Sequence, residues 1–359
     1  MKKPLIIPFF IPHAGCPFTC VYCNQWKISG KEDEIKPEEI EQYVETYLQK
    51  ARSWPDRYVE IAFYGGSFTA LPLEKQVRFL QAAAAQKEKG WIKGIRLSTR
   101  PDYINEDILE NLLFYGVTTV ELGVQSLVDE VLTKSRRGHC VHDTARATRL
   151  LRKYPLQVGY QLMLGLPGDS LASAHLTAQR TVEAKPDFVR IYPTLVLKGT
   201  TLAKWYEEDK YTPWSLDMAI QMAVSWLGVF SFYQIPVIRL GLQAVENLAV
   251  EKDLVAGPYH PAFGELVESR LLLEQIQVGI GKLQVQAGEV LTIFFQPRLY
   301  SQVVGQKKRN LLFLQEKYQF KEINLKPQED LAEPDLEIAT ARQRVQIKRQ
   351  DFLQRYRII

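Results

Sequence analysis

The stretch LIIPFFIPHAGCPFTCVYC, residues 5–23, joins an apolar segment to three closely spaced cysteines. Residues 5–11 have the length and composition of a buried strand. Cys16, Cys20 and Cys23 follow in the pattern C-x3-C-x2-C, and thiolates this close together can hold a metal centre. A structural zinc site takes four ligands, and a cubane iron–sulfur cluster is normally held by four thiolates. Three cysteines favour a cluster with one iron left open for a small molecule; the alternatives are an irregular zinc site or a buried thiol cluster.

Two further side chains could supply a fourth ligand. His13 lies inside the same stretch, and Cys140 is far away in the sequence. Cys140 is flanked by His139 and His142, but this pattern is weak for a metal site because no second cysteine pair accompanies it. We interpret these residues as the start of a helix.

Strand-like and helix-like segments alternate from residue 5 to about residue 200. The predicted strands are residues 5–11, 58–64, 94–98, 119–124, 157–164 and 188–192. The predicted helices are a segment that Pro37 opens and residues 73–89, 106–115, 142–153 and 170–185. Such alternation with short connections favours parallel strands with helices packed outside. We therefore predict an α/β fold, a partial (β/α)6 TIM-type barrel whose chemistry lies at the carboxyl ends of the strands.

The pattern changes beyond about residue 200. A long helix is predicted over residues 216–233, a last strand over 237–240 and a helix near 263–275. Short strands are predicted over residues 290–295, 310–314 and 322–325. We assign residues 1–240 to the barrel and residues 241–359 to a small C-terminal α+β extension.

Composition narrows the class of protein. The 359 residues are 46% hydrophobic and 24% charged, which is ordinary for a globular protein. No run approaches the ~20 apolar residues of a membrane span. We see no signal peptide and no dispersed cysteine pairs, so we expect a reducing, cytoplasmic location and no membrane partner. The net charge of +4 is compatible with an anionic partner but does not establish one.

The cysteine pattern, with Tyr22 before its last cysteine and with Gly65-Gly66-Ser67 downstream, resembles the radical S-adenosylmethionine (radical SAM) superfamily over roughly residues 5–200. Four further blocks are similar to the catalytic-subunit family of Elongator: residues 100–102, 121–126, 137–139 and 190–196. A fifth block, residues 255–263, resembles the C-terminal extension of bacterial members of the same group. The chain differs from that family because no acetyltransferase-like domain with a Gly-rich acetyl-CoA loop follows the barrel. The resemblance therefore does not imply that this chain performs the family's complete reaction, carboxymethylation of the wobble uridine of transfer RNA.

The resemblance implies two cofactors. Cys16, Cys20 and Cys23 would hold a [4Fe–4S] cluster, and S-adenosylmethionine would bind its open iron through amino and carboxylate groups. One electron from an external donor of the flavodoxin or ferredoxin type would cleave a carbon–sulfur bond. The products would be methionine and a 5′-deoxyadenosyl radical, so the barrel must exclude water and competing reactants.

The resemblance also implies contacts to S-adenosylmethionine. Gly65 and Gly66 would leave room for its amino group, where a Cβ would obstruct the approach. Gln125 and Arg137 fall where oxygen-independent coproporphyrinogen oxidases contact the cofactor, and Arg137 could pair with its carboxylate. The full set of expected contact residues is Tyr22, Gly65, Gly66, Ser67, Ser98, Gln125, Arg137 and Gln161. No catalytic residue is assigned.

Ser98 and Gln161 stand where those oxidases carry acidic residues. This departure weakens the expectation of a porphyrinogen substrate. Tyr22 could cover the cluster or the adenine, or simply pack in the core. His260, Tyr192 and Lys198 are weaker candidates for the substrate side of the site.

Two enzymatic functions remain open. The first is modification of RNA, with tRNA as partner, because basic residues in the tail are interleaved with aromatic ones. These are Lys307-Lys308-Arg309, the arginines from Arg342 onward, Phe313, Tyr318 and Phe320. The second is a small-molecule oxidoreductase or transferase like coproporphyrinogen oxidase. A scaffold without turnover is disfavoured, because Gly65, Gly66 and Gln125 imply a nucleoside pocket.

Overall fold

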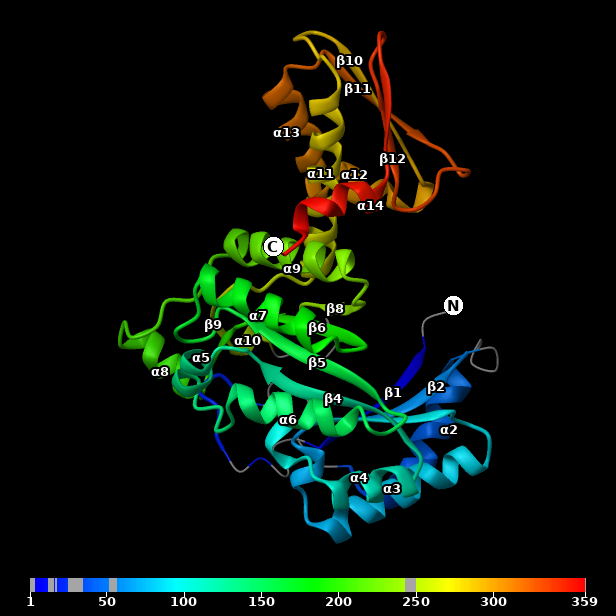
Figure 1. Cartoon of the computed structure of the whole chain (residues 1–359), viewed down its shortest axis with the longest axis vertical. Coiled ribbons are helices and arrows are strands. Elements are labelled where there is room, and N and C mark those ends of the chain that lie inside the picture. The colour runs from blue at the N-terminus through cyan, green and yellow to red at the C-terminus, as the bar shows by residue number, and fades with distance from the viewer. Residues whose placement is uncertain are drawn as a thin grey trace. The chain divides into compact units, whose positions relative to one another are not determined.

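The computed structural model describes residues 4–11, 16, 18–24, 35–51, 57–242 and 250–358. Contacts within the chain divide it into two units (Figure 1). Unit 1 comprises Met1–Trp214 and Gln243–Pro258, and unit 2 comprises Ser215–Leu242 and Tyr259–Ile359.

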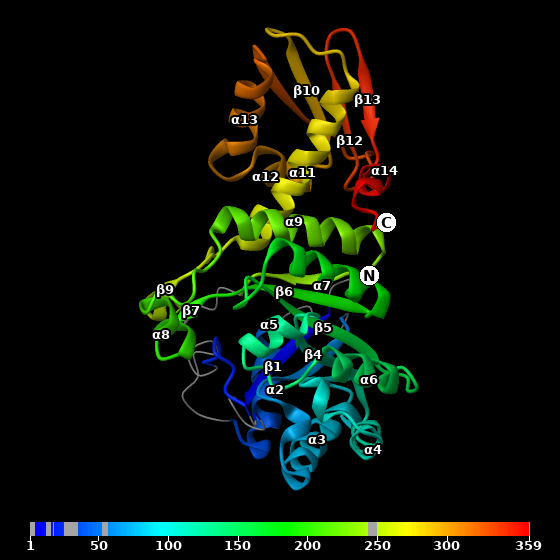
Figure 2. The ribbon, with the colours of Figure 1, turned by 60° about the vertical axis from the view of Figure 1, so that its left-hand side comes forward.

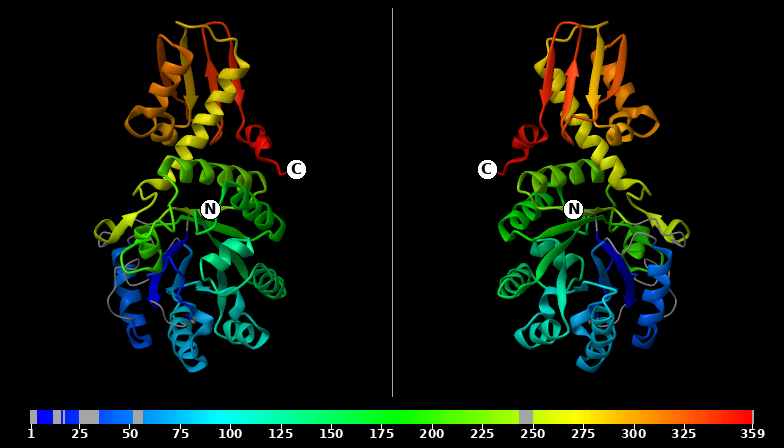
Figure 3. Two further views of the ribbon diagram at one scale, coloured as in Figure 1. Left: turned by 90° about the vertical axis from the view of Figure 1, so that its left-hand side faces the viewer. Right: turned by 90° about the vertical axis from the view of Figure 1, so that its right-hand side faces the viewer.

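Six parallel strands of unit 1 lie side by side in chain order. They are β1 (Leu5–Ile11), β2 (Val59–Gly65), β3 (Gly94–Thr99), β4 (Val117–Gln125), β5 (Gln157–Leu164) and β6 (Phe188–Pro193). Figure 3 shows the sheet curled, with helices around its outside. Burial is almost continuous along β3 and β4, as expected for parallel strands covered on both faces. The predicted partial (β/α)6 TIM-type barrel is confirmed.

Each crossover between these strands contains a helix. The crossover helices are α2 (Ile40–Lys50), α3 (Leu73–Glu88), α4 (Glu106–Phe114), α6 (Val141–Leu151) and α7 (Leu171–Ala184). Capping residues mark where two of these helices begin. The side chains of Asn105 and Ser170 accept hydrogen bonds from backbone amides in the first turns of α4 and α7. Cys140 is the N-cap of α6, so this helix begins where we predicted.

Several short elements of unit 1 were not predicted from the sequence. They are α5 (Asp129–Lys134), β7 (Val196–Leu197), α8 (Thr201–Glu207), α10 (Val250–Asp253) and β9 (Leu254–Ala256). β7 and β9 pair antiparallel, although about 60 residues separate them. Elements of two to seven residues are too short to show a periodic pattern.

Unit 2 contains a four-stranded sheet in the order β11-β10-β12-β13 (Figure 2). Its strands are β10 (Val290–Phe295), β11 (Glu322–Pro327), β12 (Leu336–Ala339) and β13 (Arg344–Ile347), and β8 (Val237–Leu240) also belongs to this unit. Its helices are α9 (Leu216–Phe232), α11 (Phe263–Lys282), α12 (Tyr300–Val304), α13 (Arg309–Tyr318) and α14 (Arg349–Leu353). The core joins alternate residues of β10 to α11, with Leu291, Ile293 and Ile276 fully buried.

Two expectations for unit 2 are wrong. Residues 310–314 form part of α13 and not a strand, because Asn310 and Leu314 are buried four residues apart, a helical spacing. Phe320 is 3% exposed and belongs to the core, so it cannot contact a nucleic acid. No helix in the described part of the chain combines the length and apolarity needed to cross a bilayer.

Candidate functional site

The predicted site residues lie partly in loops after the parallel strands and partly in the strands themselves. The cysteines follow β1, Gly65-Gly66-Ser67 ends β2, Ser98 lies near the end of β3, and Gln125 ends β4. Gln161 lies on β5. The structure brings them together in two groups, the cysteine loop with Arg137, Ser67 and Gln125, and Ser98 with Gln161.

Arg137 connects the cysteine loop to β4. Its Nη1 donates to Cys20 Sγ at 3.4 Å, and its Nη2 donates to the Gly123 carbonyl at 2.7 Å. The loop is also fixed by its backbone, since the Val21 amide donates to the Ser135 carbonyl at 3.2 Å. Cys20 and Arg137 are 6% and 8% exposed, so this contact is formed away from bulk water.

Gly123 makes this arrangement possible, although sequence reasoning assigned it no role. A Cβ at Gly123 would lie 2.7 Å from Arg137 Nη2 and 3.1 Å from Gln125 Nε2. The side chains of Gln125 and Arg137 therefore lie beside each other over residue 123. Gln125 adopts φ 65° where the register of β4 and β5 shifts. The sequence signal was a glycine in the interior of a predicted strand.

Cys16 lies against the end of β2. Its sulfur accepts a hydrogen bond from the Ser67 amide, and burial raises the pKa of its thiol, an effect that the nearby Arg137 opposes. The Gly66 amide donates to the Ile11 carbonyl at 2.8 Å. Gly65 has φ 103°, and a Cβ there would lie 3.2 Å from the Ile11 carbonyl oxygen. Gly65 thus permits the close approach of β1 and β2 just before the cysteine loop.

The Ser67 hydroxyl is held by the protein itself. It hydrogen-bonds to Thr99 Oγ1 at 3.0 Å and accepts from the Arg100 amide at 3.2 Å. The side chain is 1% exposed. Of the Ser67 groups, the backbone N–H is the one that reaches the cysteine loop.

Tyr22 packs against a cluster that contains Val21, Val196 and Leu202. Its phenol also forms a hydrogen bond with Cys20, and burial and this neighbour raise the pKa of Tyr22 well above its usual value. Both roles considered for Tyr22, core packing and proximity to the cysteines, are therefore compatible with its position.

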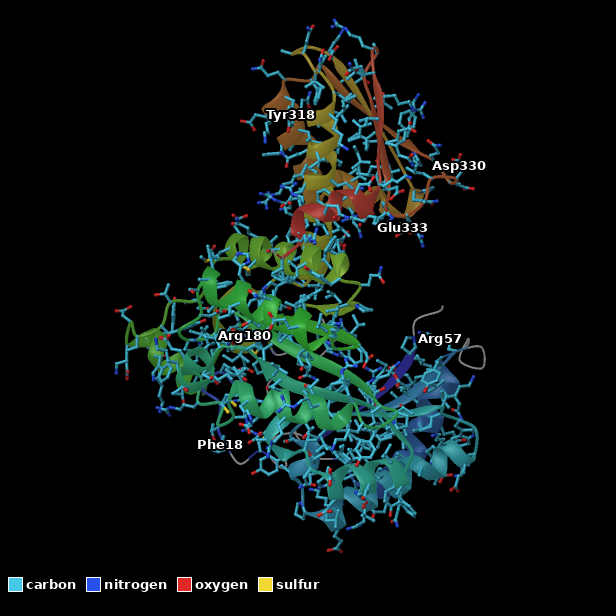
Figure 4. The ribbon with its side chains drawn as sticks, in the orientation of Figure 1. Phe18, Arg57, Arg180, Tyr318, Asp330 and Glu333 are labelled. Carbon is cyan, nitrogen blue, oxygen red and sulfur yellow. The ribbon has the colours of Figure 1, made fainter. Side chains whose placement is uncertain are left out.

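Phe18, labelled in Figure 4, is a half-exposed aromatic residue of the cysteine loop. Its ring lies 4.8 Å from the Arg100 guanidinium carbon, and a Cβ at Gly138 would lie 2.6 Å from the ring. Arg100 is fixed in turn by two hydrogen bonds to Asp102 at 2.8 and 2.9 Å and by one to the Arg137 carbonyl at 2.6 Å. The outer part of the loop therefore packs on an arginine that hydrogen bonds hold in place.

Ser98 and Gln161 come together inside the barrel. Gln161 Nε2 donates to Ser98 Oγ at 2.9 Å and to Glu121 Oε2 at 3.1 Å. Glu121, which is 0% exposed, also pairs with Arg96 at 2.8 Å and with Arg190 at 2.7 Å.

This buried network extends across five strands and was missed by sequence reasoning. Arg96 also pairs with Glu60 at 2.7 Å, and Arg190 donates to the Tyr64 hydroxyl at 2.7 Å. Burial raises the pKa of Glu121, but Arg190 and Arg96 more than offset this, so its pKa is lower than usual. Charged residues inside strands that are otherwise apolar were the available signal.

Comparison with known families matches residues 10–180 to the Radical SAM superfamily and residues 186–272 to the Radical SAM C-terminal domain. The chain belongs to the radical SAM superfamily. It is therefore an enzyme of that class, and the cofactors predicted from the sequence, a [4Fe–4S] cluster and S-adenosylmethionine, are those of the superfamily.

The similar proteins agree with the Elongator-like resemblance. A tRNA uridine(34) acetyltransferase of Dehalococcoides mccartyi is 32% identical over 60% of this chain and 52% of its own length. Mouse Elongator complex protein 3 is 29% identical over 48% of this chain and 35% of its own length. The structure of Methanocaldococcus infernus Elp3 with an N-terminal deletion has a TM-score of 0.61 and 25% identity, covering 76% of this chain and 63% of that one. The chain thus spans about a third to a half of the length of these curated relatives.

The surroundings of Cys20 suit an anionic group. Among the residues that the structure describes, no three His, Cys, Asp or Glu side chains converge tightly enough to ligate one ion. In a cubane cluster each thiolate binds a different iron, so the sulfurs need not converge on one point. Arg137 beside Cys20, with a buried Nε that has no partner among the described groups, suits an anionic cluster and a carboxylate ligand.

The remaining candidates lie elsewhere. His13 is outside the described residues, and Cys140 is exposed. His139 is buried, and burial together with Arg137 and Arg100 lowers its pKa to about 2, so its ring is neutral. His260 Nδ1 accepts the Ala262 amide at 3.0 Å, a structural role in unit 2. Lys198 is exposed and donates to the Lys252 carbonyl.

Proposed function

We propose that this radical SAM enzyme modifies a uridine of tRNA. The observation that carries the proposal is the Arg137 junction, which holds Cys20 against the end of β4 beside Gln125. It joins the cysteine loop to the strand end where the nucleoside of the cofactor would bind. The 32% identity to a tRNA uridine(34) acetyltransferase supports a uridine of tRNA as the substrate.

The chain's residues would hold the cofactors as follows. Cys16, Cys20 and Cys23 would be the cluster ligands, and Arg137 would balance their charge. When bound and reduced by one electron, the cofactors would supply radical chemistry that removes one hydrogen atom from the substrate. Gly65 and Gly66 would leave space for the amino group of the cofactor at the end of β2.

The other predicted contacts lie where a nucleoside could reach them. Ser98 and Gln161 already share a hydrogen bond inside the barrel and would turn toward a ribose. Tyr22 lies within the cysteine loop beside Cys20, Gln125 lies next to Arg137 at the end of β4, and the Ser67 amide donates to Cys16. Burial of Cys20, Ser98 and Arg137 keeps water away from the reacting atoms.

The electron donor and location follow from the same chemistry. An external flavodoxin or ferredoxin would supply single electrons at low potential, and the cytoplasm contains both such donors and tRNA. These assignments belong to the proposal.

The first experiment tests the radical chemistry. Anaerobically reconstituted protein with dithionite should convert S-adenosylmethionine to 5′-deoxyadenosine, and Cys20→Ala should abolish the product. Cys140→Ala is the matched control, because Cys140 is an exposed cysteine at a helix start. Equal product from the Cys20 variant and the wild type would refute the assignment.

The second experiment tests the substrate. Nucleosides from the tRNA of a deletion strain should lack one modified uridine, and the purified enzyme should restore it on that tRNA. Loss of a small metabolite with an unchanged nucleoside profile would favour the small-molecule oxidoreductase instead.

A further inference from the structure

Helix α13 of unit 2 has one buried face and one outward face. Asn310 and Leu314 are 6% and 0% exposed and form the buried face. The Asn310 amide nitrogen donates to Ser269 Oγ at 2.9 Å and to the Gln302 carbonyl at 2.9 Å, which fixes the start of the helix. The orientation of the outward face is thereby determined.

The outward face carries a stripe of cations and an aromatic ring, which we call the α13 stripe: Arg309, Phe313 and Lys317. Residues four apart are neighbours along a helix, so these three side chains follow one another. Lys317 Nζ lies 5.3 Å from the centre of the Phe313 ring. Phe313 is 37% exposed, and Leu312 beside it is 59% exposed. Figure 4 labels Tyr318 at the end of the same helix, and Lys317 Nζ lies 5.4 Å from that ring as well.

The turn before α13 extends the positive surface. Lys307 and Lys308 are exposed and adopt φ 52° and 61°, a left-handed conformation that is uncommon for lysine. The turn is closed by the Lys308 amide, which donates to the Gly305 carbonyl at 3.0 Å. Three cations in succession, residues 307–309, therefore precede and begin the helix.

Lys307, Lys308, Arg309 and Lys317 are exposed, and like several other cations of unit 2 they form no ion pair with any residue that the structure describes. In contrast, Arg298, Arg342 and Arg344 pair with Glu333, Glu289 and Glu337. Residues 259–359 contain 15 lysines and arginines and 12 acidic residues. Within the described residues, four unpaired cations therefore lie in or just before α13, whose one acidic residue is Glu316, and they are accompanied by the exposed Phe313.

We propose that the α13 stripe and residues 307–308 bind RNA, with the cations on the phosphate backbone and Phe313 under an unpaired base. Phosphates attract cations that have no internal partner, and single-stranded bases stack on exposed aromatic rings. An acidic protein segment would satisfy the cations but would leave the exposed Phe313 without a stacking partner. The inference rests on the proposed function, because it assigns the tRNA substrate a second contact surface on unit 2.

The test compares two triple variants of the full-length, reconstituted enzyme. The test variant is Lys307→Gln, Lys308→Gln and Arg309→Gln; the control is Arg298→Gln, Arg342→Gln and Arg344→Gln, which removes the same charge from paired arginines. Binding of fluorescent bulk tRNA is measured by anisotropy between 50 and 300 mM NaCl (roughly the range over which phosphate contacts weaken). We expect the test variant to lose at least about tenfold in affinity and the control less than about threefold.

The salt dependence provides a second readout. Each phosphate contact contributes about 0.7 to 0.9 to the slope of log affinity against log salt. The slope of the test variant should therefore fall by about two. Phe313→Ala should weaken binding without changing the slope, and Phe313→Tyr should restore it. Thermal unfolding of each variant checks that unit 2 remains folded.

The outcomes separate the inference from the proposed function. Wild-type affinity and slope in the test variant, or equal losses in the two triple variants, would overturn the α13 surface even if tRNA is modified. Phosphate contacts are strong at about 50 mM NaCl. If the wild-type protein neither binds nor modifies tRNA under this condition, both the α13 surface and the proposed function are wrong. Uncoupled formation of 5′-deoxyadenosine should be unchanged in all variants, since these residues lie outside unit 1.

Discussion

Arg137 contacts two parts of unit 1 with one guanidinium group. Its two terminal nitrogens reach Cys20 and the Gly123 carbonyl, and its own carbonyl accepts from Arg100. A charged hydrogen bond is about twice as strong as a neutral one. The cysteine loop is therefore fixed to β4 through a single residue.

We predict that Arg137→Gln lowers the rate of 5′-deoxyadenosine formation at least tenfold (about 1.4 kcal/mol or more in the barrier). Glutamine cannot reach both partners and supplies no charge. The variant should also lose about 1–3 kcal/mol of stability, because the buried Gly123 carbonyl loses its donor. Product is measured by chromatography and normalised to iron and sulfide content.

Arg136→Gln is the matched control for this prediction. Arg136 is the neighbouring arginine, is exposed, and stacks over Trp205 at 5.4 Å. The Arg136→Gln variant should form 5′-deoxyadenosine at the wild-type rate and contain the wild-type amount of iron and sulfide. Similar losses in the two variants would show that the loop needs positive charge in general and not the Arg137 contacts.

Gly123 allows a second test at the scale of one residue. A methyl group at this position would meet Arg137 Nη2 at 2.7 Å and Gln125 Nε2 at 3.1 Å, so both side chains must move. We predict that Gly123→Ala raises the dissociation constant for S-adenosylmethionine about tenfold while the cluster still assembles, since about 1.4 kcal/mol of contact energy would be lost. Equilibrium dialysis under anaerobic conditions measures this.

Gly281→Ala is the corresponding control. Gly281 lies in α11, and a Cβ there meets nothing within 4 Å. Alanine should stabilise the helix by about 0.5–1 kcal/mol and leave cofactor binding unchanged. Unchanged binding in the Gly123 variant would mean that Gln125 and Arg137 do not act on the cofactor from their present positions.

At the scale of elements, the strands of the barrel are joined by the network around Glu121. Side chains from β2, β3, β4, β5 and β6 contribute to it. Removing one member of a buried ion pair costs about 3–5 kcal/mol, because the partner charge stays buried. We therefore predict that Glu121→Gln lowers the free energy of unfolding by about that amount at pH 7, measured by urea denaturation.

The effect of Glu121→Gln should depend on pH. Because the folded protein lowers the pKa of Glu121, its contribution is fully present above the ordinary glutamate range near 4.3 and is lost as pH falls through the lower folded value. The difference between wild type and variant should thus shrink below about pH 4. Glu130→Gln, at an exposed pair with Lys134, should leave the free energy of unfolding almost unchanged throughout this pH range, because solvent screens the pair.

The elements of unit 1 were largely predictable from the sequence, and its side-chain contacts were not. Strand residues 157–164 and helix residues 73–88 match the predicted segments closely, because apolar periodicity and short loops give strong local signals. The Arg137 to Cys20 contact joins positions 117 residues apart, and no local pattern encodes such a pair. In α13 the apolar run 311–314 was short enough to suit either a strand or a helix.

At the scale of the whole molecule, the division between the two units remains to be tested. The sequence places the boundary at residue 240, and this stays a prediction. Within unit 2, α9 precedes that position yet packs against α11 and α14. The Tyr233 hydroxyl forms a hydrogen bond with the Ile358 backbone at 3.2 Å, and a Cβ at Gly228 would lie 2.6 Å from the Tyr356 ring.

These contacts predict that α9 is needed for unit 2 to fold. A fragment of residues 215–359 should unfold cooperatively with heat, whereas a fragment of residues 241–359 should melt at a lower temperature or without cooperativity. Deleting α9 would expose apolar side chains of α11 and α14, each worth roughly 1.5–3 kcal/mol when buried. Circular dichroism on the two fragments measures the transitions. If residues 241–359 unfold as cooperatively and at the same temperature, the boundary lies at residue 240 and α9 belongs to the barrel.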